Sequence, residues 1–461
     1  VAVIGPAADT VSYGDYTETR GRKGGVSVLD GIRAAVSPET EVLYERGCNF
    51  LGQALHPFDP SMLRDENGES GLTGHYYNGP VPQGEPVQVR TDRTVNFNWI
   101  FALPHPALDA NCFSVVWTGS VVMPRTMDGC IGLSTQDSMR LYVDDKLLID
   151  GWGKDKSADQ ALDFHFEAGR TYKIRIEFVN DRRGARVIFG YSAGRENFPA
   201  AVEAARKADV AILCMGDNEE TSGENFDRTD LNLPGRQLEL VQAVYATGTP
   251  VVLVLQSGRP VTANWENDHL PAILEAWFPG EQGGTAIAKT LFGDAAPGGR
   301  LPITFPRSVG QIPCHYSRRP GGGKRYVEMD WLPLYPFGYG LTYTTFAYRD
   351  MALSRSVIDP QDTVTVSVTV TNTGKYTGDA VPQLYVRDMF SSVVKPERQL
   401  AAFRRLTLAP GESRRVELTV GPKQLRTLGP DYVWRVEPGK FELQLGDNAE
   451  NILLRADLTV E

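Results

Sequence analysis

The part of the sequence richest in groups that can move a proton is the polar loop 215–235. Its ionisable side chains are Glu219, Glu220, Glu224, Asp227, Arg228 and Asp230. Gly223 lets the backbone bend next to Glu224, and a carboxyl group on such a loop can act as a general acid or base. The types and spacing of these residues therefore predict a site for acid/base chemistry.

The elements on either side of this loop must hold it in place. Residues 209–214 are typical of a buried strand, and residues 236–246 have the spacing of a helix. In an open α/β sheet, ligands are bound by the loops that follow the carboxyl ends of the strands. We therefore expect the loop to lie at that edge of a parallel sheet.

The surrounding pattern predicts a doubly wound α/β domain. Residues 1–5 indicate a short buried strand, and residues 27–36 indicate a helix with a Ser cap. The same alternation resumes further along the chain, where 250–258 is a β-branched run typical of a central parallel strand. Residues 1–68 and 197–343 are therefore predicted to form one α/β sandwich domain with an insertion in a surface loop.

Two regions have the alternation of antiparallel strands instead. Residues 69–196 contain alternating runs between turn residues, which predicts an inserted β-sandwich, with 143–146 as the tip of a hairpin. Residues 344–461 include the strictly alternating run 362–374 and predict a second sandwich of immunoglobulin or fibronectin type. The fold class is thus a multidomain combination of α/β and all-β parts.

The composition argues against several classes of protein. A chain of 461 residues is too long for one ordinary core and suggests roughly three domains. The net charge of −10 argues against a protein that follows nucleic-acid phosphates, and no apolar run of about 18 residues predicts a membrane span. The five cysteines have neither zinc nor disulfide spacing, so no metal or cofactor is predicted. The compartment and the oligomeric state stay open, a homo-oligomer included.

Several motifs resemble the second domain of glycoside hydrolase family 3, the group of β-glucosidases and β-xylosidases. They stand in the family's order at 222–228 (Ser-Gly-Glu-Asn-Phe-Asp-Arg), 231–235, 277–286, 291–294, 297–302 and 335–343 (Tyr-Pro-Phe-Gly-Tyr-Gly-Leu-Thr-Tyr). The predicted insertion, with 71–77 and 134–143, looks like a protective-antigen-type (PA) domain, which several members carry at this place. The tail resembles the family's fibronectin type III-like domain, notably at 371–374, 383–387 and 406–412.

The resemblance assigns a role to one acid of the loop. Retaining glycosidases use a nucleophile and an acid/base, with carboxyl groups about 5–5.5 Å apart. The family pattern places the acid/base at Glu224, although Asn225 stands where many members have Gly, so Glu219 and Glu220 stay as alternatives. Asp227 and Arg228 are predicted to form a structural ion pair that shapes the loop.

The nucleophile is not expected in these residues. In the family it is an Asp in a Ser-Asp-Trp-like motif on an N-terminal (β/α)8 barrel, which has no counterpart here. The Asp-Trp pair at Asp330–Trp331 lies in a linker-like segment and is interpreted as structural. We expect the barrel in the same polypeptide or in a separate chain.

The resemblance therefore implies the C-terminal part of a retaining exo-β-glycosidase that supplies the general acid/base. The first expectation is a β-glucosidase that hydrolyses terminal non-reducing β-D-glucosyl residues of a β-glucoside or oligosaccharide. A β-xylosidase or another member of the family is an alternative within the same class. A non-catalytic carbohydrate-binding protein is the alternative from another class.

Three residues are candidates for contact with substrate. Sugar rings pack their C–H faces on aromatic rings, which selects Trp99 and Trp152 of the predicted insertion. Tyr76 and Trp117 are predicted to belong to its core. Asp15 is the third candidate, because its Gly-rich loop follows the first predicted strand.

Overall fold

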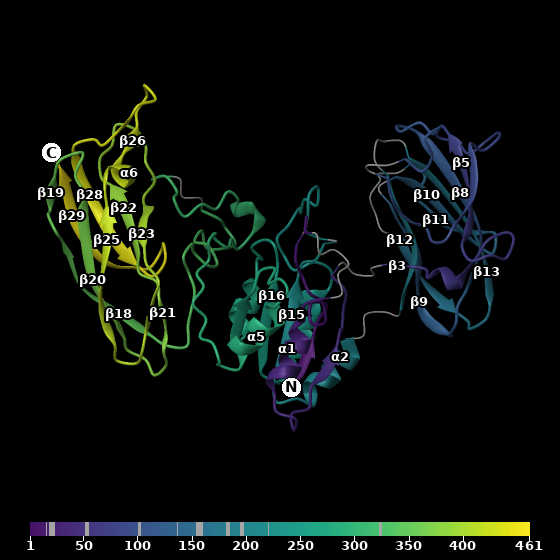
Figure 1. Ribbon diagram of the computed structural model, residues 1–461, viewed down its shortest axis with the longest axis horizontal. Helices are drawn as coiled ribbons and strands as arrows, with labels where there is room; N and C mark the ends of the chain where they lie inside the picture. The colour runs from purple at the N-terminus through teal and green to yellow at the C-terminus, as the bar shows by residue number, and fades with distance from the viewer. Residues whose placement is uncertain are drawn as a thin grey trace. The chain divides into compact units, whose positions relative to one another are not determined.

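The chain folds into two compact units, which are described separately. In this computed structural model the described residues are 1–461 apart from 15, 18–23, 51–54, 100–102, 136, 154–159, 181–184, 194–197, 220 and 322–324. The first unit is formed by Val1–Arg46 together with Ala201–Glu461, and the second, called the insert, by Gly47–Ala200 (Figure 1). The insert therefore interrupts the first unit along the chain.

The first unit contains a parallel five-stranded sheet with helices. In spatial order its strands are β17 (Ala272–Glu275), β16 (Val251–Gln256), β15 (Ala211–Gly216), β1 (Ala2–Ile4) and β2 (Leu43–Glu45). The helices are α1 (Val28–Ala35), α2 (Phe198–Arg206), α3 (Gln237–Tyr245), α4 (Asn264–His269) and α5 (Gly283–Leu291). Every residue of β15 is buried, as expected of a central strand in a parallel sheet. The α/β fold predicted for this part is confirmed.

The strand order changes direction at the centre of this sheet. From β1 the chain adds β2 on one side, and after the insert it adds β15, β16 and β17 on the other. The loops that follow β1 and β15 therefore diverge at their carboxyl ends, which is where open α/β sheets bind ligands. The loop singled out in the sequence follows β15 at this point.

Helices α1 and α5 approach each other closely through glycine residues. The Oγ of Ser27 caps α1 by accepting a hydrogen bond from the Asp30 N–H at 3.1 Å. A Cβ added to Gly31 would lie 2.1 Å from the backbone oxygen of Gly284, and one added to Gly284 would lie 1.8 Å from that of Ser27. Residues without a side chain are thus required where the start of the first unit packs on the part that follows the insert.

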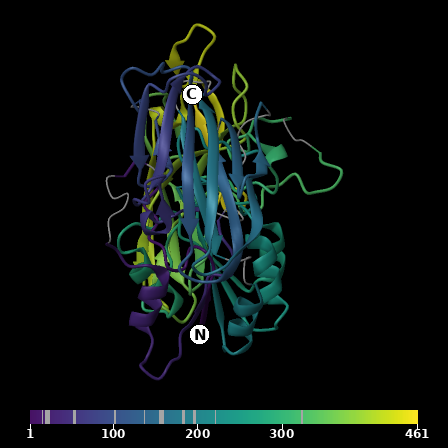
Figure 2. The ribbon, with the colours of Figure 1, turned by 90° about the vertical axis from the view of Figure 1, so that its right-hand side faces the viewer.

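The insert is a β-sandwich of two sheets, and Figure 2 looks onto its long strands, which lie side by side. One sheet has the order β11 (Lys146–Asp150), β10 (Ser138–Val143), β13 (Thr171–Asn180), β8 (Phe113–Val122), β5 (Leu72–Asn78) and β6 (Gln88–Asp92), with β4 (Leu63–Arg64) against β8. The other has the order β12 (Gln160–Phe166), β9 (Met127–Thr135), β14 (Arg186–Ala193) and β3 (His56–Pro57), with β7 (Asn96–Asn98) against β14. The sequence placed the start of the insertion at 69, whereas β3 and β4 already pair with strands of the sandwich.

The buried carboxylate of Asp92 lies against the aromatic core of the insert. Tyr76 and Trp117 are fully buried, as predicted, and their O–H and Nε1–H donate to Oδ2 of Asp92 at 2.6 and 2.8 Å. The Arg90 guanidinium pairs with the other oxygen of Asp92 at 2.7 Å. A buried carboxylate is tolerated when it is paired and hydrogen-bonded in this way.

The C-terminal part of the first unit is a second β-sandwich. Its main sheets are β18 (Phe346–Leu353), β20 (Val364–Asn372) and β25 (Ser413–Val420), and β19 (Val357–Ile358), β29 (Ile452–Val460), β28 (Gly439–Gly446), β22 (Gln383–Asp388) and β23 (Gln399–Phe403). Two smaller pairs are β21 (Gly378–Ala380) with β24 (Leu406–Leu408), and β26 (Thr427–Leu428) with β27 (Trp434–Arg435), and α6 spans Pro422–Leu425. Buried and partly exposed residues alternate along β20, which confirms the strand predicted from its alternating sequence.

Side chains hold the segment between α5 and this sandwich in place. Nε2 of Gln383 donates to the backbone oxygen of Gly338 at 3.0 Å. The Arg318 guanidinium pairs with Glu397 at 3.1 Å and with Glu450 at 2.8 Å. The α/β part and the second sandwich are therefore linked within one compact unit.

Candidate active site

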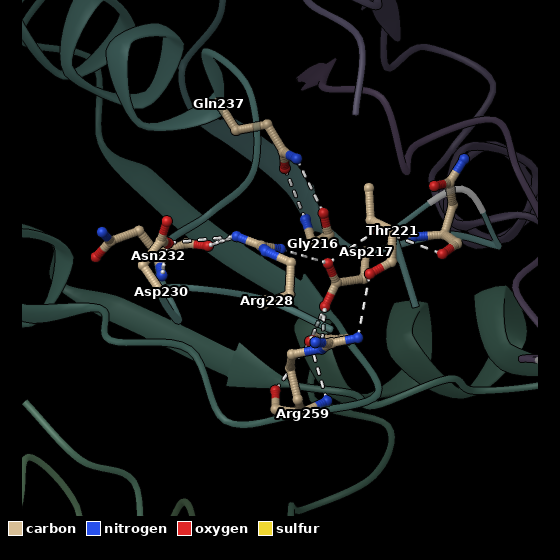
Figure 3. Close-up of polar contacts among 10 residues, drawn as sticks. Gly216, Asp217, Thr221, Arg228, Asp230, Asn232, Gln237 and Arg259 are labelled. Carbon is tan, nitrogen blue, oxygen red and sulfur yellow. Dashed lines mark hydrogen bonds and ion pairs between the residues drawn. The ribbon is translucent and has the colours of Figure 1, made fainter. Parts of the chain in front are cut away.

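The acidic loop, defined here as residues 217–235, begins at a constrained end of β15. Gly216 has a φ of 140°, and a Cβ there would lie 1.9 Å from the backbone oxygen of Gln256. Gln237, at the start of α3, accepts from the Gly216 N–H through Oε1 at 2.7 Å and donates to its oxygen through Nε2 at 2.9 Å (Figure 3). The two ends of the loop are therefore tied together.

Most of the polar contacts of the acidic loop involve Asp217, its first residue (Figure 3). Its side chain is 2% exposed and accepts hydrogen bonds from Thr221 Oγ1 at 2.9 Å and Ser257 Oγ at 2.7 Å. Guanidinium nitrogens of Arg228 and Arg259 lie 3.3 and 3.6 Å from its two oxygens. These four groups offset the loss of water around a buried carboxylate.

Arg228 connects this carboxylate to the far side of the loop. Its Nη2 donates to the backbone oxygen of Asn232 at 2.9 Å and lies 3.4 Å from Oδ1 of Asp230. The predicted ion pair between Asp227 and Arg228 is wrong, since the carboxylate partners of Arg228 among the described residues are Asp217 and Asp230. The reason is burial: Asp217 needs a cation nearby, whereas the exposed Asp227 is hydrated.

Glu224 lies in a tight turn of the loop. The Phe226 N–H donates to the backbone oxygen of Gly223 at 3.2 Å, and Asn225 has a φ of 63°. Among residues with a Cβ, Asn is one of the few that adopt this left-handed conformation readily. Asn225 can therefore occupy a position at which the family pattern has Gly. The Glu224 side chain is exposed, so a ligand or a partner can reach its carboxyl group.

The two alternative acids precede this turn. Glu220 lies outside the described residues. Glu219 is partly buried, next to a turn in which the N–H groups of Thr221 and Ser222 donate to the backbone oxygen of Asn218 at 3.1 and 2.9 Å. Glu219 and Glu220 stay as alternatives to Glu224.

Phe278 lies against two loops at the carboxyl edge of the sheet. A Cβ added to Gly14 would lie 3.1 Å from its ring, and one added to Gly258 would lie 2.8 Å from the ring and 2.9 Å from Ser222 Oγ. The loops after β1 and β16 therefore pack on one aromatic side chain, and Ser222 of the acidic loop lies beside Gly258 of the second of them.

Glu275, three residues before Phe278 in the chain, is a partly buried acid at the end of β17. Its Oε1 accepts a hydrogen bond from the Trp277 N–H at 2.9 Å, which holds Trp277 at a φ of 53°. Its Oε2 is buried and has no hydrogen-bond partner within the described part of the chain. Burial raises the pKa of Glu275 to about 8, and the nearby Asp217 carboxylate acts in the same direction. The carboxyl group of Glu275 therefore keeps its proton at neutral pH.

Sequence reasoning missed Asp217, Ser257 and Glu275, which share one kind of position. Asp217 directly follows β15, Ser257 directly follows β16, and Glu275 ends β17. The carboxyl ends of parallel strands lie at one edge of a sheet, so these residues meet there. Comparing the residues at the ends of the predicted strands would have found them.

Trp99 is a correction to the predicted substrate contacts. It is 8% exposed, and its ring stacks on Phe97 and Trp117 at centroid distances of 4.7 and 6.3 Å inside the core of the insert. A sugar ring cannot reach a face that other aromatic rings cover. Trp99 stabilises the sandwich instead, through its buried area and its aromatic contacts.

The structure does not decide whether the other two predicted residues, Trp152 and Asp15, contact substrate. Trp152 is partly buried in the insert, with the Arg140 guanidinium 4.8 Å from its ring centroid. Asp15 lies outside the described residues, and its neighbour Tyr16 is 77% exposed. The structure therefore leaves Trp152 and Asp15 as predictions.

Other features that point to function lie away from the acidic loop. Two cavities of the first unit, of about 370 and 890 Å³, are lined by residues from 291 onward. Within the described ranges, no three His, Cys, Asp or Glu side chains are grouped so that they could hold a metal ion. None of the helices described here is both long and apolar enough to cross a membrane.

Two family models match the chain. The model of the glycosyl hydrolase family 3 C-terminal domain matches residues 1–343, and that of the fibronectin type III-like domain matches residues 380–449. The first range spans the α/β part together with the insert, and the second lies within the second sandwich of the first unit.

Several known proteins are similar to the chain. It is 45% identical over 302 residues to a β-xylosidase of Formosa agariphila, covering 63% of this chain and 42% of that protein. It is 34% identical over 495 residues to a β-glucosidase of Rhizobium radiobacter, covering 100% and 59%. The structure of a Kluyveromyces marxianus β-glucosidase in complex with glucose matches with a TM-score of 0.73 and 28% identity, covering 100% and 59%. The chain thus spans about half the length of these relatives.

Proposed function

The chain belongs to glycoside hydrolase family 3, and on this basis we propose that it forms the C-terminal part of a retaining exo-β-glycosidase. The first expectation is a β-glucosidase, with a β-xylosidase as the alternative, because similar proteins carry both names. The substrate is a β-glucoside or oligosaccharide with a terminal non-reducing β-D-glucosyl residue.

The proposed role of the chain is to supply the acid/base, Glu224. The observation that supports it is the construction of the loop: Asp217 and its partners are buried, while Glu224 is exposed in a fixed turn. An exposed carboxyl group on a loop with a buried, hydrogen-bonded base suits a residue that must protonate the glycosidic oxygen. The same carboxylate then takes a proton from the water that releases the glycosyl-enzyme.

The nucleophile belongs to the proposed (β/α)8 barrel, in the same polypeptide or in a separate chain. Its Asp attacks the anomeric carbon as Glu224 donates its proton, which requires the two carboxyl groups about 5–5.5 Å apart. The exposure of Glu224 leaves its carboxyl group accessible for that approach.

The test of Glu224 uses leaving groups of different acidity. In the enzyme that includes the barrel, Glu224→Gln should slow hydrolysis of alkyl β-glucosides by about 10²–10⁴-fold, because their poor leaving group needs a proton. An activated aryl β-glucoside should still form the glycosyl-enzyme, seen as a burst of released phenol. Azide should then speed its breakdown, since azide attacks without a general base.

Glu219→Gln is the matched control, being an acid of the same loop, and should keep the parent's dependence on the leaving group. The opposite result, with the dependence in Glu219→Gln and not in Glu224→Gln, would assign the acid to Glu219. The chain without the barrel should not hydrolyse any of these substrates, and turnover by the purified chain would contradict a site shared with a barrel.

We further propose that the insert is a protective-antigen-type domain and that Trp152 contacts substrate. Support comes from the two-sheet sandwich at the place where the sequence motifs predict it. In the complete enzyme, Trp152→Ala should raise the KM for oligosaccharides several-fold. Trp434→Ala is the matched control, because Trp434 likewise has an arginine, Arg426, over its ring, at 4.4 Å. Equal KM values for the two variants would remove Trp152 from the site.

A further inference from the structure

A groove of about 890 Å³ lies where the end of α5 meets β21 of the second sandwich. The residues that matter for its chemistry are the aromatic Phe292, Tyr343 and Tyr376 and the polar Asp294, Asp379 and Thr407. Two of the sequence motifs, 291–294 and 335–343, end in this groove, and the acid/base chemistry uses neither. The groove is therefore a candidate for a function different from that of the acidic loop.

Three aromatic side chains that line the groove are exposed to solvent. Phe292 is 42% exposed, Tyr343 is 44% exposed and Tyr376 is 64% exposed. The Tyr343 hydroxyl donates to the backbone oxygen of Thr290 at 2.5 Å, which fixes its ring at the end of α5. Exposed apolar surface gathered in a concave site marks a place where a ligand binds.

The polar groups of the groove are mainly hydrogen-bond acceptors. Asp294 is exposed and has no hydrogen bond or ion pair in the part of the chain that the structure describes. Asp379 accepts from Arg405 Nε and from Thr407 Oγ1, both at 2.6 Å, so its carboxylate is held in one orientation. Arg405 pairs with Asp379, so its positive charge is neutralised and would attract an anion only weakly.

These features match a neutral ligand with many hydroxyl groups and apolar ring faces. Hydroxyl donors can bond to the carboxylates, and C–H faces can pack on the three rings. The volume is in the range of sites that enclose small molecules, about 300–1,000 Å³. We propose that this groove is a second oligosaccharide-binding site, which holds a β-linked chain of a few sugars.

The test measures binding of cellotriose, laminaritriose and xylotriose to the complete chain by ligand-observed NMR and calorimetry. Tyr376→Ala and Phe292→Ala should weaken binding of the preferred trisaccharide about tenfold, the loss expected when one aromatic contact is removed. Tyr432→Ala is the matched control, since Tyr432 is an 85% exposed tyrosine on the β26–β27 hairpin of the same sandwich. Thermal unfolding of each variant checks that the fold is retained.

The site is independent of the proposed catalytic role, and a second variant separates the two. Glu224→Ala should leave trisaccharide binding to this groove unchanged, even if it abolishes hydrolysis in the enzyme that includes the barrel. The proposal is overturned if no trisaccharide binds saturably, or if Tyr432→Ala weakens binding as much as Tyr376→Ala. It is also overturned if Glu224→Ala alone removes binding, which would place the sugar at the acidic loop.

Discussion

At the scale of single residues, the acidic loop depends on the buried carboxylate of Asp217. Asp217→Asn keeps the shape of the side chain but leaves Arg228 and Arg259 without the anion they share. Removing one partner from a buried ionic group leaves an unpaired charge, so we expect the free energy of unfolding to fall by about 2–4 kcal/mol. Urea denaturation of the purified chain measures this change.

The matched control is Asp230→Asn, which removes a carboxylate from the same guanidinium of Arg228. Asp230 has a 49% exposed side chain, and its loss should change the free energy of unfolding by less than about 1 kcal/mol. Equal and small effects of the two substitutions would show that Asp217 does not hold the loop together.

Glu275 makes the stability of the first unit dependent on pH. Its pKa is raised from an ordinary 4.5 to about 8, so between these values the folded chain keeps a proton that the unfolded chain releases. Its contribution to stability is therefore complete below pH 4.5 and is lost as the pH rises through 8. Glu275→Gln removes this loss, and from pH 5 to pH 8.5 it should gain about 3–4 kcal/mol relative to the parent.

Urea unfolding of parent and variant at the two pH values tests this expectation. Glu239→Gln is the control, because Glu239 is 58% exposed and pairs with Arg236 on the surface of α3. Parallel pH profiles for the parent and Glu275→Gln would mean that Glu275 is ionised at neutral pH.

Not every residue role could be read from the chain. The turn at Glu224 is local, formed by residues 223–226, whereas the role proposed for Glu224 stays a prediction from the family pattern. Asp217 and Ser257 follow different strands, β15 and β16, and their hydrogen bond depends on which strands are adjacent. Trp99 was chosen because an aromatic ring can pack on a sugar, but the same ring can pack on other aromatic side chains, and the sequence does not show which neighbours it has.

At the scale of elements, the packing of α1 on α5 joins the two parts of the α/β domain. Gly284→Ala should favour helix formation by about 1 kcal/mol if the helix were isolated. In the folded chain its Cβ would lie 1.8 Å from the backbone oxygen of Ser27, which forces the helices apart. We therefore expect a net destabilisation of about 1–3 kcal/mol, measured by urea denaturation.

Gly299→Ala is the comparison for this substitution, since a Cβ at Gly299 would meet nothing within 4 Å. It should leave the stability almost unchanged. If Gly284→Ala were equally neutral, the close approach of α1 and α5 would not contribute to the fold.

The elements themselves were largely predictable, and their pairing was not. The buried run of β15 and the alternation of β20 are patterns within one segment, so each strand could be recognised alone. The short strands β3 and β4 have only two residues each and gain their order from pairing with β14 and β8. Such strands carry no periodicity that a sequence can reveal.

At the scale of the whole molecule, the two compact units have separate hydrophobic cores. We expect calorimetry of the complete chain to show more than one unfolding transition, since each core can melt cooperatively by itself. Gly284→Ala should lower the transition temperature of the first unit and leave that of the insert unchanged. A single transition that moves as a whole would show that the units unfold together.

The position of β1 in the sheet has a consequence for the order of folding. Ala2 of β1 pairs with Ala211 of β15, so β1 gains this partner only after the chain has passed through the insert. Closing so long a loop is entropically unfavourable and slow, and an insert that folds first shortens it. Pulse-labelled hydrogen exchange should therefore protect the amides of β8 and β13 before those of β1 and β15. Simultaneous protection of the amides of all four strands would contradict this order. In this order the acidic loop, which follows β15, forms only after the insert has folded.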